Sequence, residues 1–144
     1  MNKSKGFTII ELIVVIAIIA VLAAIVLVNV TSYINKGKNA AIKGNLATMM
    51  TNAAVYFDGS PASFGSTYVA TTNVSVPEAA ITSAGGTPAH FGLTTTQDWC
   101  ACAMEVPTGA TGTVFCVDGT GAKKETAATT CAAQCVTPAT GKCL

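Results

Sequence analysis

Two groups of residues in this 144-residue chain have types and spacings that suit chemistry. Near the N-terminus, Glu11 is an acid at the start of an apolar run, four residues after Phe7, and Phe7 follows Gly6. Six cysteines lie after residue 99, namely Cys100, Cys102, Cys116, Cys131, Cys135 and Cys143. The first group suggests proteolytic processing and ion pairing, and the second suggests disulfide or metal chemistry.

The apolar run that contains Glu11 is long enough to cross a bilayer. Residues 7–28 would form a helix of roughly 33 Å, and a bilayer core is about 30 Å thick. A carboxylate in such a helix is costly, yet no cation lies within helical reach and Thr8 offers only a hydroxyl. Cleavage after Gly6 would give Phe7 a free amine, which could pair with Glu11 of a neighbouring copy. Without cleavage, the same residues describe a signal anchor that tolerates one acid.

An ordinary secretory signal fits this N-terminus poorly. Lys3 and Lys5 give a short basic start, but the small residue at a plausible cleavage point, Gly6, precedes the apolar run instead of following it. Lysines also follow the run, so their distribution does not orient the helix. We place the C-terminal region outside the cytoplasm because its cysteines favour an oxidising compartment.

Residues 5–12, Lys-Gly-Phe-Thr-Ile-Ile-Glu-Leu, closely resemble the class III signal of type IV prepilins and related pseudopilins. In that family a membrane aspartyl peptidase cuts after the glycine and methylates the new N-terminal residue. The resemblance implies that residues 1–6 are a cleaved leader, that the scissile bond joins Gly6 to Phe7, and that Phe7 is N-methylated. It also implies that Glu11 assists assembly and that the apolar helices form the core of a filament.

The helix is predicted to continue beyond the apolar run as an amphipathic half, residues 29–57. Apolar residues there recur at helical spacing and give one stripe for packing against a domain: Ile42, Leu46, Met49, Met50, Ala53, Tyr56 and Phe57. A turn signal, Asp58-Gly59-Ser60-Pro61, ends the helix. Many pilins carry a helix-breaking glycine at the position of Ala20 and a proline at that of Val28, so local melting is not expected here.

The rest of the chain, residues 58–144, is predicted to form a small head. Residues 58–96 are rich in small and polar residues and are expected to be a connecting loop, with a short helix near Pro77–Ala84. Residues 97–125 contain strand-like runs separated by turns, which predict an antiparallel β-meander. The predicted fold is therefore α+β and type IV pilin-like: a long N-terminal helix packed on a small antiparallel sheet, with a disulfide-stapled C-terminal loop, residues 126–144.

The cysteines predict a disulfide framework whose pairing is only partly set by the strands. Cys100 and Cys102 point to the same face of a strand and are therefore poor partners for each other. One of them is expected to bridge Cys116 on the adjoining strand, and the other cysteines to tie down the C-terminal loop. Zinc is the competing interpretation, but only Cys131 and Cys135 have the spacing of a zinc knuckle. No metal and no cofactor is expected.

Composition and motifs favour a structural role over catalysis. Charged residues make up 10% of the chain and no arginine is present, so no nucleic-acid partner is predicted from charge. His90, the one histidine, has no nucleophile beside it, and no catalytic set can be assembled. We therefore expect a non-enzymatic filament subunit rather than an exported enzyme.

The expected protein is a type IV pilin that polymerises with copies of itself. Its partners would be the prepilin peptidase, the pilus assembly machinery and the cytoplasmic membrane, in which the subunit is stored with its head outside before it enters an extracellular pilus. A pseudopilin of a type II secretion system is one alternative. A membrane-anchored, cysteine-rich binding domain that acts as a monomer is another. Adhesion, motility, DNA uptake and conduction cannot be distinguished from these residues.

Overall fold

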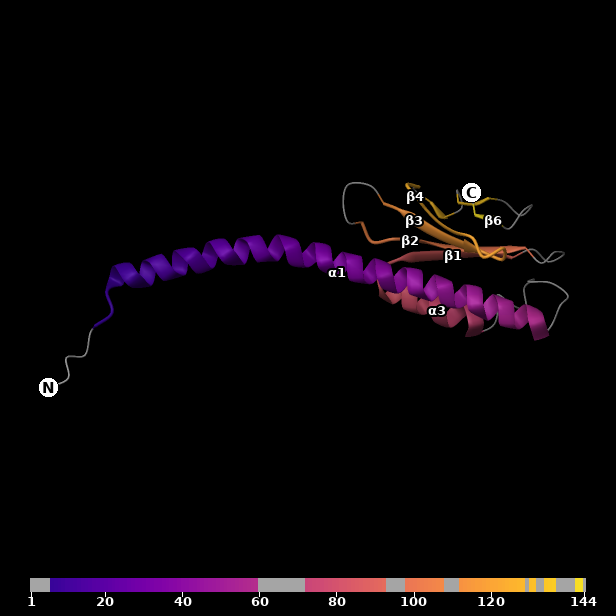
Figure 1. The fold of residues 1–144 in the computed structure, drawn as a ribbon, viewed down its shortest axis with the longest axis horizontal. Coiled ribbons are helices and arrows are strands. Elements are labelled where there is room, and N and C mark those ends of the chain that lie inside the picture. Colours follow the sequence, from indigo (N-terminus) through magenta and orange to yellow (C-terminus); the bar gives the residue numbers. More distant parts are fainter. Residues whose placement is uncertain are drawn as a thin grey trace. The chain divides into compact units, whose positions relative to one another are not determined.

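A computed structural model of the chain describes residues 6–59, 72–92, 98–107, 112–128, 130–131, 134–136 and 142–143. The chain divides into two units, Met1–Ile34 and Asn35–Leu144. Helix α1, Ile9–Gly59, contributes to both of them (Figure 1). The predicted α+β fold is confirmed: a long N-terminal helix precedes a small antiparallel sheet and a disulfide-bonded C-terminal region.

The first unit consists of the apolar part of α1. Its large apolar side chains are between 45% and 79% exposed, so the described residues leave them uncovered. By length and composition, α1 is also the one helix among the described residues that could span a membrane. A helix that is apolar on all sides requires lipid or other helices around it.

The second unit contains a four-stranded antiparallel sheet and a two-stranded one. The larger sheet has the order β1-β2-β3-β4, with strands Thr87–Gly92, Trp99–Met104, Val114–Asp118 and Lys123–Thr126. Strands β5, Cys135–Val136, and β6, Lys142–Cys143, form the smaller sheet. The meander predicted over residues 97–125 corresponds to β2, β3 and β4.

Alternation along β2 and β3 gives the larger sheet two buried faces. Trp99, Ala101 and Val117 belong to the core cluster that includes the α1 stripe. Cys100 and Cys116 belong to a second cluster, together with the cysteines of the C-terminal segment. Because successive side chains of a strand point to opposite faces, the helices cover one face of the sheet and the C-terminal segment covers the other.

The apolar stripe predicted on α1 packs against the sheet as expected. Its four innermost side chains are at most 1% exposed: Ile42, Leu46, Met49 and Ala53. The other members, Met50, Tyr56 and Phe57, are partly buried and pack against the same core. Spacing of three and four residues places these side chains on one face of the helix, which explains why the sequence pattern located the core correctly.

The region predicted as a connecting loop, residues 58–96, contains two elements among the residues described, so that prediction was incomplete. Helix α3, Thr72–Ser83, begins before the short helix predicted near Pro77–Ala84 and buries Val74, Pro77 and Ile81. Proline lacks an N–H, so Pro77 leaves the carbonyl of Asn73 without its helical donor. The Asn52 side chain of α1 donates to that carbonyl at 2.9 Å, which ties the two helices together.

Strand β1 is the second of these elements, and the sequence did not predict it. All six of its residues pair with β2, from Thr87 opposite Met104 to Gly92 opposite Trp99. Its sequence, Thr-Pro-Ala-His-Phe-Gly, shows no alternation and includes Pro88, which signals a break in most strands. Proline is tolerated at a sheet edge because one side of the strand needs no ladder donor, and β1 lies at the edge.

The turn from α3 to β1 depends on two glycines. Gly85 has a φ of +93°, a conformation that residues with a Cβ rarely adopt. A Cβ on Gly86 would lie 2.7 Å from Ile42 Cδ1 and 2.9 Å from Ile81 Cγ2. The absence of a side chain at this position therefore permits β1 to approach the helices closely.

Candidate functional site

The proposed cleavage site lies just before the first turn of α1. Residues 6–8 are non-helical, and α1 begins at Ile9. Phe7 is 79% exposed, and a Cβ built on Gly6 would meet nothing within 4 Å beyond its own chain neighbours. The Gly6–Phe7 peptide bond therefore lies in exposed, non-helical chain, where proteolytic cleavage is favoured.

Thr8 and Glu11 form a reciprocal cap on the start of the helix. The Thr8 backbone N–H and hydroxyl donate to Glu11 Oε2 at 2.9 Å and 2.7 Å. In return, the Glu11 N–H donates to the Thr8 hydroxyl oxygen at 3.3 Å. This is the capping box, in which a Thr at the N-cap and a Glu three residues later satisfy each other's backbone donors.

The cap corrects one expectation about Glu11. The sequence indicated that this acid lacks a good partner within its own chain and that Thr8 is a weak one. In the structure, Thr8 supplies a backbone N–H in addition to its hydroxyl. The signal was present in the Thr-x-x-Glu spacing, but an interpretation based on charge alone passed over it. Both hydrogen bonds go to Oε2, and among the described residues no hydrogen bond goes to Oε1.

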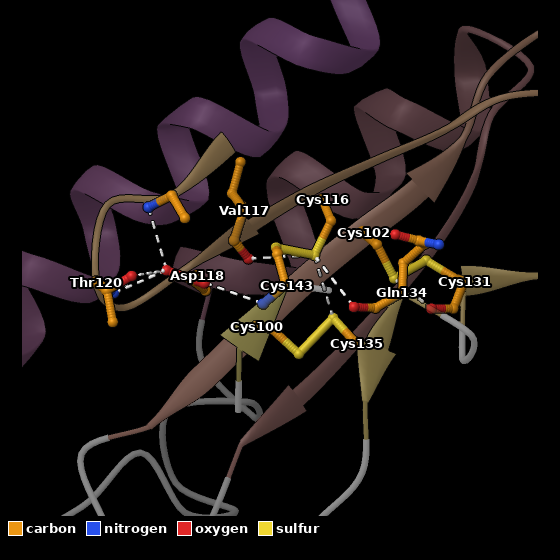
Figure 2. Close-up of a disulfide and its surroundings, with 11 residues drawn as sticks. Cys100, Cys102, Cys116, Val117, Asp118, Thr120, Cys131, Gln134, Cys135 and Cys143 are labelled. Atoms are coloured by element: carbon orange, nitrogen blue, oxygen red, sulfur yellow. Dashed lines mark hydrogen bonds between the residues drawn. A yellow bond between two sulfur atoms is a disulfide. The ribbon is translucent and has the colours of Figure 1, made fainter. Parts of the chain in front are cut away.

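The structure joins the six cysteines in three disulfides that fasten the C-terminal segment to the sheet (Figure 2). The bridges are Cys100–Cys135, Cys102–Cys131 and Cys116–Cys143, with Cα–Cα distances of 5.9, 5.6 and 5.9 Å. The cysteine sulfurs lie in a buried cluster between β2, β3 and the C-terminal segment. Each bridge therefore links one sheet cysteine to one C-terminal cysteine.

The expected bridge from Cys100 or Cys102 to Cys116 is wrong. Cys102 and Cys116 lie directly opposite each other in the β2–β3 ladder, yet each bonds to the covering segment. Side chains directly opposite in antiparallel strands have Cβ atoms about 4.5–5.5 Å apart, whereas disulfides favour about 3.8 Å. A segment lying over the face can place its own cysteines more favourably than the neighbouring strand can.

Asp118 anchors the end of β6 to the β3–β4 turn. Its Oδ1 accepts from the Thr120 N–H, the Thr120 hydroxyl and the Ala122 N–H at 2.6–3.1 Å, and its Oδ2 accepts from the Cys143 N–H at 2.9 Å (Figure 2). Burial alone would raise the pKa of this carboxyl, which is 1% exposed. The four hydrogen bonds outweigh burial and hold the pKa of Asp118 below its usual value.

Lys43 links α1 to Glu105, which follows strand β2, and to Glu125 of the edge strand β4. Its Nζ lies 3.1 Å from Glu105 Oε1 and 2.5 Å from Glu125 Oε2, and 5.4 Å from the ring centre of Phe115. The Glu105 side chain is 3% exposed and also accepts from the Thr113 hydroxyl. Burial alone would lower the pKa of the Lys43 amine, but its contacts with Glu125 and Glu105 prevail and raise that pKa.

Among the residues that the structure describes, the remaining polar groups do not form a reactive set. His90 Nδ1 lies 2.5 Å from Glu78 Oε1, which joins β1 to α3. A cleft of about 570 Å³ is lined by α1, Trp99 and the β3–β4 turn, and no titratable side chain that the structure describes lines it. No group of three or more His, Cys, Asp or Glu side chains suited to a metal occurs within the described ranges.

Comparison with known proteins concerns the N-terminal segment. Residues 1–27 match the family model of the prokaryotic N-terminal methylation motif. This match confirms the resemblance to the class III signal over those residues. Comparisons with curated proteins and with solved structures found no match.

Proposed function

We propose that this chain, which carries the class III signal of type IV pilins and pseudopilins over residues 1–27, is a pilin that polymerises into a surface filament. The methylation motif is the observation that carries the proposal. It implies processing by a prepilin peptidase and assembly into a pilus-like filament. The cut would fall between Gly6 and Phe7, and Phe7 would become the N-methylated first residue.

The uncovered apolar helix supports polymerisation. Residues of α1 such as Ile13, Ile16 and Leu22 are 54–57% exposed, in a stretch that carries no charge after Glu11. Full burial of one such side chain contributes about 1.5–3 kcal/mol, so the helix gains strongly from lipid or from sibling helices. Storage in the cytoplasmic membrane followed by transfer into a filament core satisfies this requirement at both stages.

Glu11 would act in docking through the oxygen that the cap leaves unused. In the structure, Thr8 occupies Oε2 twice, and Oε1 faces no hydrogen-bond donor of the described chain. After cleavage, the ammonium group of Phe7 in a neighbouring copy can pair with Oε1 while the cap persists. This arrangement holds the incoming subunit in register and neutralises the acid inside an apolar core.

The stapled head favours a pilus exposed outside the cell over a pseudopilus that remains in the periplasm. Three disulfides hold the C-terminal segment across one face of the sheet. Disulfides form in the periplasm too, but dense stapling of this kind is typical of small secreted domains. The head would coat the filament and carry whatever surface activity the pilus has.

Processing is tested by the intact mass of the protein purified from membranes and from sheared filaments. We expect a chain that begins at Phe7 and carries one added methyl group. A Gly6→Leu variant should accumulate with the leader attached, whereas Ser4→Ala, a change in the same leader away from the scissile bond, should mature normally. A filament-derived chain that still begins at Met1 would overturn the proposal.

Assembly is tested with two variants that separate the charge of Glu11 from its capping role. Glu11→Gln keeps an oxygen that accepts from Thr8 but removes the charge, and we expect normal membrane insertion with few or no filaments. Thr8→Val removes the capping hydroxyl and keeps the carboxylate, and we expect a milder defect. Shear-and-count electron microscopy gives the readout. Normal piliation in Glu11→Gln would refute the docking role.

A further inference from the structure

The cysteine cluster brings two different disulfides into contact. Cys102 lies opposite Cys116 in the larger sheet, and Cys135 lies opposite Cys143 in the smaller one. Cys116 is bonded to Cys143, but its Sγ also lies 3.7 Å from the Sγ of Cys135, which is bonded to Cys100 (Figure 2). This spacing is van der Waals contact between sulfurs of separate bridges.

We propose that Cys116–Cys143 is an exchangeable disulfide, and that Cys143 is a site of S-thiolation by low-molecular-weight thiols, coupled to transfer of Cys116 onto Cys135. The contact between Cys116 and Cys135 carries the proposal, because thiol–disulfide exchange requires the attacking sulfur to reach the sulfur it attacks. The inference concerns the head alone and does not depend on polymerisation.

The exchange proceeds in two balanced steps. First, the thiolate of the external thiol bonds to Cys143 Sγ, the Cys116–Cys143 bond breaks, and its electron pair passes to Cys116 Sγ. Second, the Cys116 thiolate bonds to Cys135 Sγ, the Cys100–Cys135 bond breaks, and its electron pair passes to Cys100 Sγ, which takes a proton from water. Three disulfides exist before and after, one of the final three being the mixed disulfide on Cys143, so no oxidant is required.

Exposure decides which sulfur of the bridge the external thiol attacks. Cys143 is 8% exposed, whereas Cys116 is fully buried. Cys143 also lies in β6, a strand of two residues at the edge of a two-stranded sheet. A strand this short opens locally at low cost, which gives a small thiol access to Cys143 and leaves Cys116 as the departing group.

The exchanged state would keep most of the head closed. Cys135 remains bonded to the sheet through Cys116, and Cys131 remains bonded to Cys102, so the start of the C-terminal segment stays attached. Release is confined to β6. The Cys102–Cys131 bridge offers a contrast: Cys131 is also 8% exposed, but Cys102 Sγ contacts the Cys131 carbonyl oxygen at 3.3 Å, and no contact with Cys135 Sγ occurs among the described residues. Opening that bridge is therefore not expected to release Cys100 from Cys135.

The first test is a time course on the full-length protein in mild detergent. Reduced glutathione at pH 8 supplies the thiolate, acid quenching with alkylation stops exchange, and peptide mapping by mass spectrometry identifies each cysteine's partner. We expect three products to appear together: a Cys116–Cys135 bridge, alkylated Cys100 and glutathione on Cys143. Alkylated Cys116 with an intact Cys100–Cys135 bridge throughout would overturn the proposal.

Two matched variants test the exchange without added thiol. Cys143→Ser leaves unpaired the sulfur that contacts Cys135, which is that of Cys116, whereas Cys131→Ser leaves unpaired the sulfur of Cys102. Because proximity raises the effective concentration of a reacting group by orders of magnitude, we expect alkylation of Cys100 to be at least about tenfold greater in Cys143→Ser than in Cys131→Ser. Equal alkylation of Cys100 in the two variants would refute the transfer step.

Discussion

Asp118 offers the sharpest test of how the C-terminal segment is held. Its carboxylate accepts four hydrogen bonds, and one of them, from the Cys143 N–H, is its direct link to β6. Asp118→Asn would keep one oxygen for the turn but place an amide N–H₂ against the Cys143 N–H. A buried donor would then face another donor instead of a charged acceptor.

The expected loss follows from these contacts. A hydrogen bond to a charged group contributes about 1.5–3 kcal/mol, and neutral bonds contribute about 0.5–1.5 kcal/mol. Asp118→Asn loses the bond from Cys143 and weakens the three bonds made by Thr120 and Ala122. We therefore expect the free energy of unfolding to fall by about 2–4 kcal/mol at pH 7, with the disulfides intact.

The assay is denaturation by guanidinium in mild detergent, followed by fluorescence. The single tryptophan, Trp99, is 4% exposed in the core and therefore reports unfolding of the head. Asp58→Asn is the control, because Asp58 is exposed at the end of α1 and its neutralisation should change stability by less than about 0.5 kcal/mol. An Asp118→Asn variant within about 0.5 kcal/mol of the parent protein would refute the anchoring role.

Acid provides an independent check on the same carboxylate. Its pKa is lower in the folded than in the unfolded protein, so its contribution to stability is fully present above the unfolded value of about 3.9. Between the two pKa values, unfolding takes up a proton. The contribution is therefore lost progressively as the pH falls below the unfolded value and through the folded pKa. The gap between the parent protein and Asp118→Asn should accordingly shrink on acidification. A constant gap from neutral pH down to about pH 2 would contradict this account.

Two further predictions use the same denaturation assay. Gly86→Ala should destabilise the head by about 1–3 kcal/mol, because the added Cβ overlaps the core. Gly44→Ala is the control and should stabilise the head by about 0.5–1 kcal/mol, because that helical position is open. Loss of stability in both variants would contradict the packing at Gly86. Lys43→Met should lower the free energy of unfolding by about 1–3 kcal/mol, because it leaves the buried Glu105 without its cation. Adding Glu105→Gln to Lys43→Met should recover part of that stability. A double variant less stable than Lys43→Met would count against an ion pair.

The elements that follow simple periodic patterns could be predicted from the sequence. The stripe from Ile42 to Phe57 repeats at helical spacing, and strands β2 and β3 alternate between core residues and cysteines, so both were located correctly. Strand β1 was missed because its position depends on contacts distant in sequence: pairing with β2 and the close approach permitted at Gly86. No local pattern encodes either contact.

The disulfide pairing was beyond prediction for a related reason. Strand alternation shows which face each sheet cysteine occupies, and this inference placed Cys100, Cys102 and Cys116 together correctly. It does not show which segment covers that face. The covering segment here brings three cysteines over the sheet, and its position also rests on Asp118 and the Cys143 N–H, a contact that spans 25 residues of sequence. The disulfide partners are therefore set by the way in which the C-terminal segment packs over the sheet.

The capping box weakens the inference from Glu11 to a neighbouring subunit. From charge alone, an acid in an apolar helix demands a partner, and a second subunit is the natural source. In the structure, Thr8 already satisfies one oxygen of Glu11, so the acid by itself does not require a polymer. The case for a filament then rests on two other observations, the methylation motif over residues 1–27 and an apolar helix that its own chain leaves exposed. The proposed cleavage after Gly6 would add what the cap lacks, because it would create a cation at Phe7 for the oxygen that Thr8 does not use.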